Sequence, residues 1–334
     1  MTQLRYTTKT MVTILQNLDN KIGQNLDSKV RPLKPVIFRI NRVHSKIFAN
    51  VPNLSELILD ENQLTNTGID RDAFYGVNQL TRLSMMKNAF TEFPARLPSS
   101  ILQLYLSQNQ ISFVSHASIS AVGDLQLLFL DRNKLSDGSF EVGSFAQLQQ
   151  LLELELGYNF LTSIPDGIYG SLQRLHLTAN QIVYLRTRQL DNFQSLQTLD
   201  LAYNRLKSVE KDSMKNLGTL MNVDLSGNNW NCDCYLLPLK QFLTSNLAHI
   251  GTREHVVCGD NEHLGLSLGQ VDDDELECSQ TNFLVNKITD NSLTVRIDTG
   301  MNSDNPPFAK YVLQYSQLGN EFLFNTWNGT AKTI

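Results

Sequence analysis

The chain repeats one arrangement of apolar and polar positions. The pattern LxxLxLxxNxL first runs from Leu54 to Leu64 and recurs seven more times, ending at Trp230. Its asparagines are Asn62, Asn88, Asn109, Asn133, Asn159, Asn180, Asn204 and Asn228. Because strand side chains alternate between two faces, the apolar residues in each unit predict a short strand with its leucines turned inward. The asparagine amide can both donate and accept hydrogen bonds, so it can satisfy backbone groups where the chain turns.

Stacking is what makes such units stable, because no single unit can bury its own apolar face. The predicted fold is therefore an α/β solenoid, with a parallel sheet on the concave face and irregular or short helical returns on the convex face. Successive asparagines are 26, 21, 24, 26, 21, 24 and 24 residues apart. The two short units contain Pro94, Pro98 and Pro165, which favour extended returns. The long units carry turn-forming insertions at 65–70 and 136–143.

The four cysteines fall together, directly after the last repeat. They are Cys232, Cys234, Cys258 and Cys278. A solenoid ends in an exposed sheet edge that needs a cover, and Trp230, Leu236, Leu239 and Phe242 have the spacing of a helix that could lie across it. Spacing alone leaves open how the cysteines pair, and it also leaves open a four-thiolate zinc site, although the single cysteines after CxC are unlike zinc-ribbon pairs. Disulfides would place the chain in an oxidising compartment.

The two ends follow other patterns. Residues 283–334 alternate apolar and polar positions, which predicts about four short strands separated by turns. Residues 33–53 form a degenerate first unit, with apolar Ile40, Val43, Phe48 and Val51. Upstream apolar residues recur every fourth position, as in a helix, but a solvated tail or translated sequence outside the mature domain is the favoured interpretation. A degenerate hairpin module and a disordered tail are the alternatives for the C-terminal end.

These repeats resemble the extracellular leucine-rich repeats of the small proteoglycans and of the fibronectin and leucine-rich transmembrane (FLRT) family. The likeness covers roughly residues 48–279, with short units of the form LPxxLxxLxL. It implies a cysteine-rich C-terminal cap in which Cys232 bonds Cys258 and Cys234 bonds Cys278. NSLTVRID followed by YVLQYSQLG is similar to the first half of a fibronectin type III domain, although Ile297 stands where tryptophan is usual. About 50 residues make only half of such a sandwich, so the natural chain is expected to continue.

Four parts are therefore expected along the chain. They are a basic leader that is helical or disordered (1–35), the repeat solenoid with eight clear units and one degenerate unit (36–230), the cysteine-rich cap (228–279) and a partial fibronectin type III-like segment (282–334).

Charge is divided unevenly along the chain. The formal net charge is −5, but residues 1–46 hold nine Lys or Arg against two Asp or Glu, and the rest holds 19 against 31. An acidic body argues against a nucleic-acid partner, which would need basic residues to neutralise phosphates. No apolar run is long enough to cross a membrane, and the start lacks the layout of a secretory signal. Membrane attachment would therefore require a segment not in this chain.

Catalytic and metal-binding patterns are weak. GLSLG at 265–269 fits the GxSxG pattern of hydrolases, but it lies between cap cysteines, where Leu264, Leu266 and Leu268 are expected to pack. The acidic run 272–275 lacks the spacing of a calcium-binding loop, and the six histidines form no ligand motif. We therefore expect no enzyme activity, no cofactor and no metal. Sequons at Asn53 and Asn328 predict glycosylation.

The concave sheet is the candidate functional surface, because its outward side chains are left for partners. The alternation turns these residues outward: Glu56, Ile58, Asp60, Arg82, Ser84, Met86, Gln103, Tyr105, Ser107, Leu127, Phe129, Asp131, Glu153, Glu155, Arg174, His176, Asp200 and Asp224, with Tyr158 and Tyr203 just beyond their strands. Phe129, Leu127, Tyr105 and Tyr158 are expected to form one apolar patch, flanked by acidic residues. The composition is typical of protein interfaces, although cross-strand packing alone is the alternative.

The sequence thus predicts a non-enzymatic, extracellular protein-binding module of a cell-surface adhesion or signalling receptor. The FLRT resemblance implies a membrane anchor beyond this chain, and partners among cell-surface receptors or matrix components. The alternative is a secreted matrix protein of the small proteoglycan type that binds collagen or growth factors.

Overall fold

The computed structural model describes residues 39–168, 170–186, 189–210, 213–245, 256–259 and 263–276, and the backbone of four strands between 282 and 323. The chain divides into two compact units, Met1–Leu276 and Glu277–Ile334. The predicted leader, the predicted Cys234–Cys278 bond and the Asn328 sequon lie outside the described residues.

Unit 1 is built on one parallel sheet of eight three-residue strands, in the order β1-β2-β3-β4-β5-β6-β8-β10. Their bounds are β1 (Glu56–Ile58), β2 (Arg82–Ser84), β3 (Gln103–Tyr105), β4 (Leu127–Phe129), β5 (Glu153–Glu155), β6 (Arg174–His176), β8 (Thr198–Asp200) and β10 (Asn222–Asp224). The central apolar residue of each strand faces that of the next strand without a shift in register. This confirms the predicted leucine-rich repeat solenoid.

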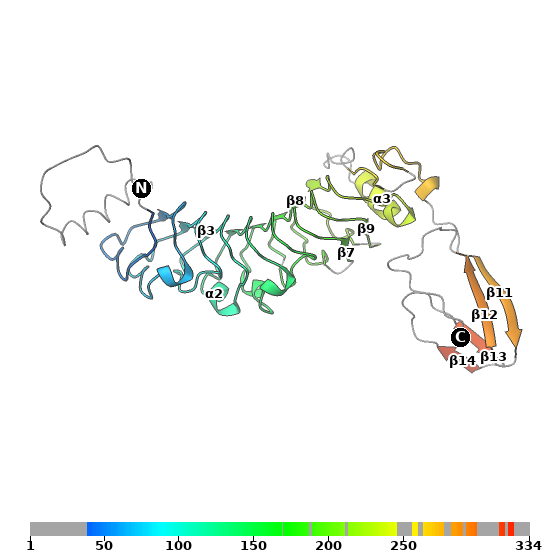
Figure 1. Ribbon diagram of the computed structural model, residues 1–334, viewed down its shortest axis with the longest axis horizontal. Helices are drawn as coiled ribbons and strands as arrows, with labels where there is room; N and C mark the ends of the chain where they lie inside the picture. The colour runs from blue at the N-terminus through cyan, green and yellow to red at the C-terminus, as the bar shows by residue number, and fades with distance from the viewer. Residues whose placement is uncertain are drawn as a thin grey trace, which may run out of the picture. The chain divides into compact units, whose positions relative to one another are not determined.

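The returns lie on the other side of the solenoid, where Figure 1 shows helix α2 (His116–Ser120) opposite the sheet. The others contain the 3-10 turns η1 (Asn66–Gly68), η2 (Asp137–Ser139) and η3 (Phe145–Gln147), and β7 (Tyr184–Leu185), which pairs with β9 (Ser208–Val209). Within the described residues the two proline-containing short units have no helical turn in their returns. The helical returns fall in longer units, which agrees with the spacing argument.

Leucines fill the interior between sheet and returns. The inward residue at the centre of each strand, such as Leu57, Leu104 or Leu154, has no exposed surface. Burying a side chain of this size contributes about 1.5–3 kcal/mol relative to leaving it in water. The solenoid therefore has one continuous core that every unit shares with its neighbours.

The repeated asparagines form a ladder that ties each rung to the one before it. Asn133 is buried; its Oδ1 accepts from the backbone N–H of Ile111 at 2.9 Å, and its Nδ2 donates to the carbonyls of Leu106 at 3.1 Å and Leu130 at 3.0 Å. The preceding residue is left-handed at all eight rungs, with φ between +52° and +66°: Glu61, Lys87, Gln108, Arg132, Tyr158, Ala179, Tyr203 and Gly227. The amide thus satisfies the backbone groups that this tight turn exposes.

The chain ahead of β1 packs onto the first rung. Val43 and Phe48 are buried, and Ile40 and Val51 are partly buried against the core. The backbone N–H of Ile40 donates to Asn62 Oδ1 at 2.9 Å, so the first ladder asparagine also has a partner.

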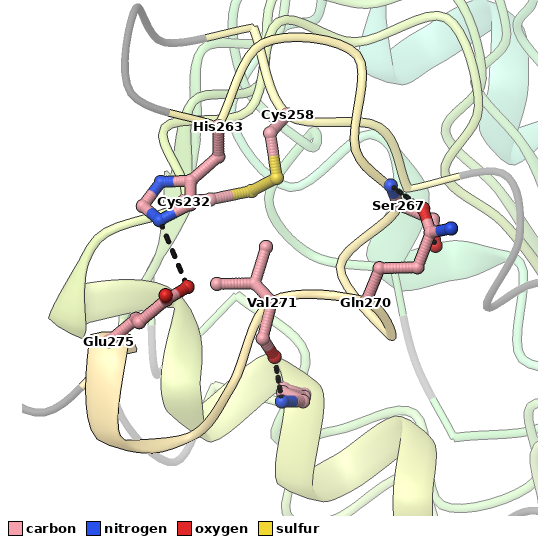
Figure 2. Close-up of a disulfide and its surroundings, with 8 residues drawn as sticks. Cys232, Cys258, His263, Ser267, Gln270, Val271 and Glu275 are labelled. Carbon is pink, nitrogen blue, oxygen red and sulfur yellow. Dashed lines mark hydrogen bonds and ion pairs between the residues drawn. A yellow bond between two sulfur atoms is a disulfide. The ribbon is translucent and has the colours of Figure 1, made fainter.

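After β10 the chain forms η4 (Cys234–Leu236), helix α3 (Leu237–Ser245) and η6 (Asp274–Leu276). Trp230 is fully buried, as are Leu236 and Leu239, and Phe242 packs partly against the core. Cys232 and Cys258 form a disulfide, with their Cα atoms 5.5 Å apart (Figure 2). The predicted first pairing is confirmed, and a zinc site with all four thiolates is wrong because two of the sulfurs are bonded to each other. That this segment is a cysteine-rich cap of the extracellular class stays a prediction.

Charged and polar contacts hold the loop around this disulfide (Figure 2). His263 Nε2 lies 3.4 Å from Glu275 Oε2, and the backbone N–H of Ser267 donates to Gln270 Oε1 at 2.9 Å. The expected packing of GLSLG is only partly correct. Leu268 is buried, but Leu264 and Leu266 are 71% and 41% exposed, because this segment turns tightly through the left-handed Gly265 (φ +83°).

Unit 2 contains two antiparallel hairpins. β11 (Asn282–Thr289) pairs with β12 (Ser292–Asp298), with an irregularity between Val285 and Lys287, and β13 (Gln314–Gln317) pairs with β14 (Asn320–Leu323). Four strands agree with the predicted alternation, while a fibronectin type III sandwich stays a prediction. Within the described residues no helix has the length and apolar character needed to cross a membrane.

Candidate functional site

The parallel register lines up the outward residues of the sheet in columns. Each unit turns a residue outward at the first strand position, at the third strand position and just after the strand. The column at the third strand position lies between the other two and is here called the middle column; it contains Ile58, Ser84, Tyr105, Phe129, Glu155, His176, Asp200 and Asp224. Its composition changes along the solenoid, from uncharged side chains at β1 to β4, aromatic at β3 and β4, to ionisable ones from β5 onward. Neighbouring strands are about 4.8 Å apart, so side chains at the same position of adjacent strands are close enough to interact, as Tyr105 and Phe129 do.

Aromatic side chains gather on β3 and β4. The rings of Tyr105 and Phe129 stack with centroids 4.8 Å apart and planes inclined by 27°. The Arg82 guanidinium lies 4.8 Å from the centre of the Tyr105 ring, and Leu127 occupies the first position of the same strand as Phe129. We call Arg82, Tyr105, Leu127 and Phe129 the aromatic platform. Tyr105, Leu127 and Phe129 are half-buried, so part of each side chain is accessible to a partner, although Phe129 and Arg82 cover the Tyr105 ring from the strands on either side.

The other apolar side chains proposed for this face are placed differently. Ile58 and Met86 are half-buried on neighbouring rungs. Tyr158 is 48% exposed, and its ring lies 3.7 Å below the Arg132 guanidinium. Tyr203 is exposed and packs over Gly227, where an added Cβ would come within 2.5 Å of the ring.

Tyr158 does not continue the aromatic platform as expected. Among the described residues its ring contacts Arg132 and makes no ring contact with Phe129. The cause is the left-handed backbone at Tyr158. This residue lies in the turn that follows β5, so its side chain lines up with those of the equivalent turns and not with the outward side chains of the strands. The two exposed tyrosines therefore belong to the rim of the concave face.

Carboxylates dominate the face from β4 to β10. We call Asp131, Glu153, Glu155, Asp200 and Asp224 the acidic stretch. Glu153 is neutralised, because Nε and Nη2 of Arg174 both lie 2.7 Å from its Oε2. His176 lies between two glutamates, with Nε2 3.9 Å from Glu153 Oε1 and Nδ1 4.0 Å from Glu155 Oε2.

Glu155 and Asp200 lack such a close basic partner in the structure described. Glu155 Oε1 accepts from the backbone N–H of Gly157 at 3.0 Å, and Asp200 Oδ1 accepts from that of Ala202 at 2.9 Å. Burial raises the pKa of Glu155 to about 7, and repulsion from Asp131, Asp200 and Glu153 adds to the shift. The pKa of Asp200 is also raised, first by burial and then by Asp224. These two carboxyl groups therefore carry electrostatic repulsion that a cation could relieve.

Two residues expected at the surface are buried instead. Ser84 Oγ donates to Asp60 Oδ1 at 2.6 Å, and Ser107 Oγ donates to Asp131 Oδ1. Both side chains are short, and each lies beneath a carboxylate from an adjacent rung. The alternation of strand residues therefore predicts the correct face of the sheet for both serines, but the prediction that they are exposed is wrong. Asp60 also accepts from the N–H of Met86 at 2.8 Å, so part of its charge is used within the sheet.

Several interactions on this face were missed by sequence reasoning. Arg132 was not a candidate, although it covers Tyr158, and the Arg174–Glu153 pair was not anticipated. The repeat register carries the signal, because a residue in one column meets a residue about one unit later, 21 positions on for Glu153 and Arg174 and 26 positions on for Arg132 and Tyr158. Aligning the eight units by their asparagines would have placed these pairs side by side.

The chemistry available here is non-covalent recognition. The described residues contain no group of three or more side chains arranged to hold a metal ion. Asn53 is exposed in the turn before β1, and its glycosylation stays a prediction. A stacked aromatic pair next to unneutralised carboxylates can bind a partner that brings apolar surface and positive charge.

Comparisons with known proteins agree with this architecture. A family model described as leucine rich repeat matches residues 170–229. The chain is similar to keratocan of Gallus gallus (34% identical over 152 residues, 46% of this chain and 42% of that protein) and lumican of Gallus gallus (34% over 155 residues, 46% and 45%). Podocan-like protein 1 of Homo sapiens is 33% identical over 185 residues, 54% of this chain and 36% of that protein. The chain thus spans less than half the length of these curated relatives.

Solved structures give the same fold. One is a chain of an octameric complex of latrophilin 3, Unc5D and the leucine-rich repeats of FLRT2, with 26% identity and a TM-score of 0.69 over 72% of this chain and 74% of that one. A chain of the Drosophila Toll–Spatzle complex has a TM-score of 0.56 over 68% and 33% at 20% identity, a likeness of fold alone.

Proposed function

We propose that this leucine-rich repeat solenoid is an extracellular, non-enzymatic recognition module that binds a partner protein through its concave sheet. The aromatic platform is the observation that carries the proposal. Two stacked rings and a leucine lie half open on a sheet face that no other described element covers. Aromatic and arginine side chains are enriched among the residues that dominate binding energy.

The related proteins support a protein partner. The FLRT2 repeats occur in a complex with Unc5D and latrophilin 3, and Toll occurs with Spatzle. Exposed aromatic side chains on a sheet can also serve cross-strand packing alone. Tyr105 and Phe129 do stack across strands, yet both side chains stay only half-buried, so part of each is accessible to a partner.

An extracellular setting is supported by the Cys232–Cys258 disulfide, because disulfides persist in oxidising compartments. Keratocan and lumican favour a secreted matrix protein, and the FLRT2 likeness favours a receptor domain. We propose the receptor domain, whose membrane anchor would lie in a segment not in this chain, because the structural likeness to the FLRT2 complex spans 72% of this chain and 74% of that one. A matrix protein that binds collagen or growth factors is the second candidate.

A binding panel tests both candidates. Purified protein is presented to an array of cell-surface ectodomains, fibrillar collagen and growth factors, and each hit is repeated with Tyr105→Ala/Phe129→Ala. Loss of the platform should weaken a true partner at least about tenfold. Phe113→Ala is the control, because Phe113 is a more exposed aromatic residue (41% exposed) that lies outside the sheet strands. Equal affinity for wild type and the double variant, with folding intact, would move the binding site off the concave face.

A further inference from the structure

We propose that the concave face selects partners that place an arginine or lysine side chain on the acidic stretch while an apolar side chain of the same segment sits on the aromatic platform. The inference rests on the proposed function and names the partner chemistry it requires. Three features of the sheet support it: the charge left unneutralised, the continuity of the two surfaces, and the spacing of the rungs.

The charges facing Glu155 do not balance. Its neighbours are Asp131 after β4, Glu153 on its own strand, Arg174 and His176 on β6, and Asp200 on β8, with Asp224 next on β10. Arg174 is engaged by Glu153, and the Arg132 guanidinium lies over the Tyr158 ring. Arg174 and Arg132 therefore have partners already. Glu155 and Asp200 accept hydrogen bonds from the backbone N–H groups of Gly157 and Ala202, and the basic group nearest to Glu155 is His176, with Nδ1 4.0 Å from Glu155 Oε2. In the part of the chain that the structure describes, neither carboxylate has an arginine or lysine partner.

An approaching guanidinium or ammonium group would relieve this repulsion. Half-buried carboxylates interact more strongly with a cation than exposed ones do, because water screens them less. Burial and like charges raise the pKa of Glu155 to about 7, so a bound cation would lower that pKa and release a proton near neutral pH. Affinity for a cationic partner should therefore fall as the pH drops through 7.

The two surfaces are continuous. Phe129 on β4 is the register partner of Glu155 on β5, one rung away. From β4 to β8 is three rungs, about 14 Å at about 4.8 Å per rung, which brings Asp200 within reach of the same ligand. An extended peptide advances about 3.3 Å per residue, so an apolar residue and a cation four positions later span about 13 Å. One short segment can thus occupy both surfaces.

A pair of synthetic peptides tests the selection. The first is fluorescein-labelled Trp-Gly-Arg-Gly-Arg-amide, and the second carries citrulline, the neutral analogue, in place of both arginines. Binding to the full chain is measured by fluorescence anisotropy at pH 8 and pH 6 in low salt. The test variant is Glu155→Gln/Asp200→Asn, which keeps the size of both side chains. Asp272→Asn/Asp274→Asn is the matched control, because these two carboxylates are exposed beside and within η6, outside the concave sheet.

Wild type should bind the arginine peptide at least about fivefold more tightly than the citrulline peptide at pH 8. That preference should shrink at pH 6, disappear in Glu155→Gln/Asp200→Asn, and persist in the control variant. Equal binding of both peptides, no binding of the arginine peptide, or the same loss in the control would overturn the inference.

Failure of the proposed function would look different. Ectodomain or collagen binding that is insensitive to Tyr105→Ala/Phe129→Ala contradicts the binding role, whatever the peptides do. Ectodomain binding that needs the platform, together with no preference for arginine over citrulline, keeps the binding role and contradicts the cationic selection alone.

Discussion

The two halves of the concave sheet have the same backbone arrangement, but their outward side chains differ in how well neighbouring side chains satisfy them. On β3 and β4 the outward residues satisfy one another, since Tyr105 and Phe129 stack and Arg82 covers Tyr105. From β5 onward Arg174 neutralises Glu153, but Glu155 and Asp200 are partly buried and repelled by neighbouring carboxylates. The first half presents apolar surface to a partner, and the second half can be stabilised by a positively charged group of the partner. One regular scaffold can therefore specify two kinds of contact.

The largest effect is expected from disrupting the asparagine ladder, which supports both halves of the sheet. Asn133→Ala deletes a buried amide that joins β3 to β4 through Ile111, Leu106 and Leu130. Leaving these backbone groups without partners should lower the free energy of unfolding by about 4 kcal/mol. Denaturant unfolding measures this loss, with the exposed Asn78→Ala as control. A change as small as that of the control would show that the ladder does not hold the rungs together.

Glu155→Gln removes the repulsion from the acidic half alone. A carboxyl group whose pKa is higher in the folded state than in the unfolded state binds more protons when folded, so stability falls as the pH rises from about 4.5 to 7. The variant should gain on the order of 2 kcal/mol at pH 8 and less than half of that at pH 5. Thermal unfolding at the two pH values measures the difference. An equal or greater gain at pH 5 would contradict the electrostatic account.

Phe129→Ala alters the aromatic half alone. Losing a half-buried ring and its stack on Tyr105 should lower the free energy of unfolding by about 1.5 kcal/mol, less than the loss for a fully buried ring. Unlike the effect of Glu155→Gln, this loss should be the same at pH 5 and pH 8. Denaturant unfolding at both values provides the check, and a loss that depends on pH would mean that the two halves are coupled.

How much the sequence predicts differs between the core and this surface. The inward leucines and the asparagine ladder repeat, so the order of the strands and the buried set follow from one unit. The burial and the direction of an outward side chain depend on its neighbours in adjacent units, which differ from one unit to the next. Ser84 and Ser107 are buried because Asp60 and Asp131 lie over them, and Tyr158 follows a left-handed turn toward Arg132.

The segment after β10 shows the same division. The Cys232–Cys258 pairing followed from a family resemblance, and the burial of Leu236 and Leu239 followed from helical spacing. Leu264 and Leu266 were expected to pack because they are leucines, but Gly265 turns the chain and leaves them in solvent. Local hydrophobicity does not reveal this turn, whose Gly265 N–H donates to the carbonyl of Cys258, a residue that the disulfide ties to Cys232.

Hydroxyl-radical footprinting of the protein with the partner found in the binding panel tests the central claim most directly. Mass spectrometry reads the oxidation of each side chain with and without the partner. The account predicts that Tyr105, Leu127 and Phe129 are protected in the complex, while Phe113 and Tyr75, which are exposed outside the sheet strands, are oxidised as before. Protection of Phe113 and Tyr75 with unchanged oxidation of Tyr105 and Phe129 would contradict binding through the concave face.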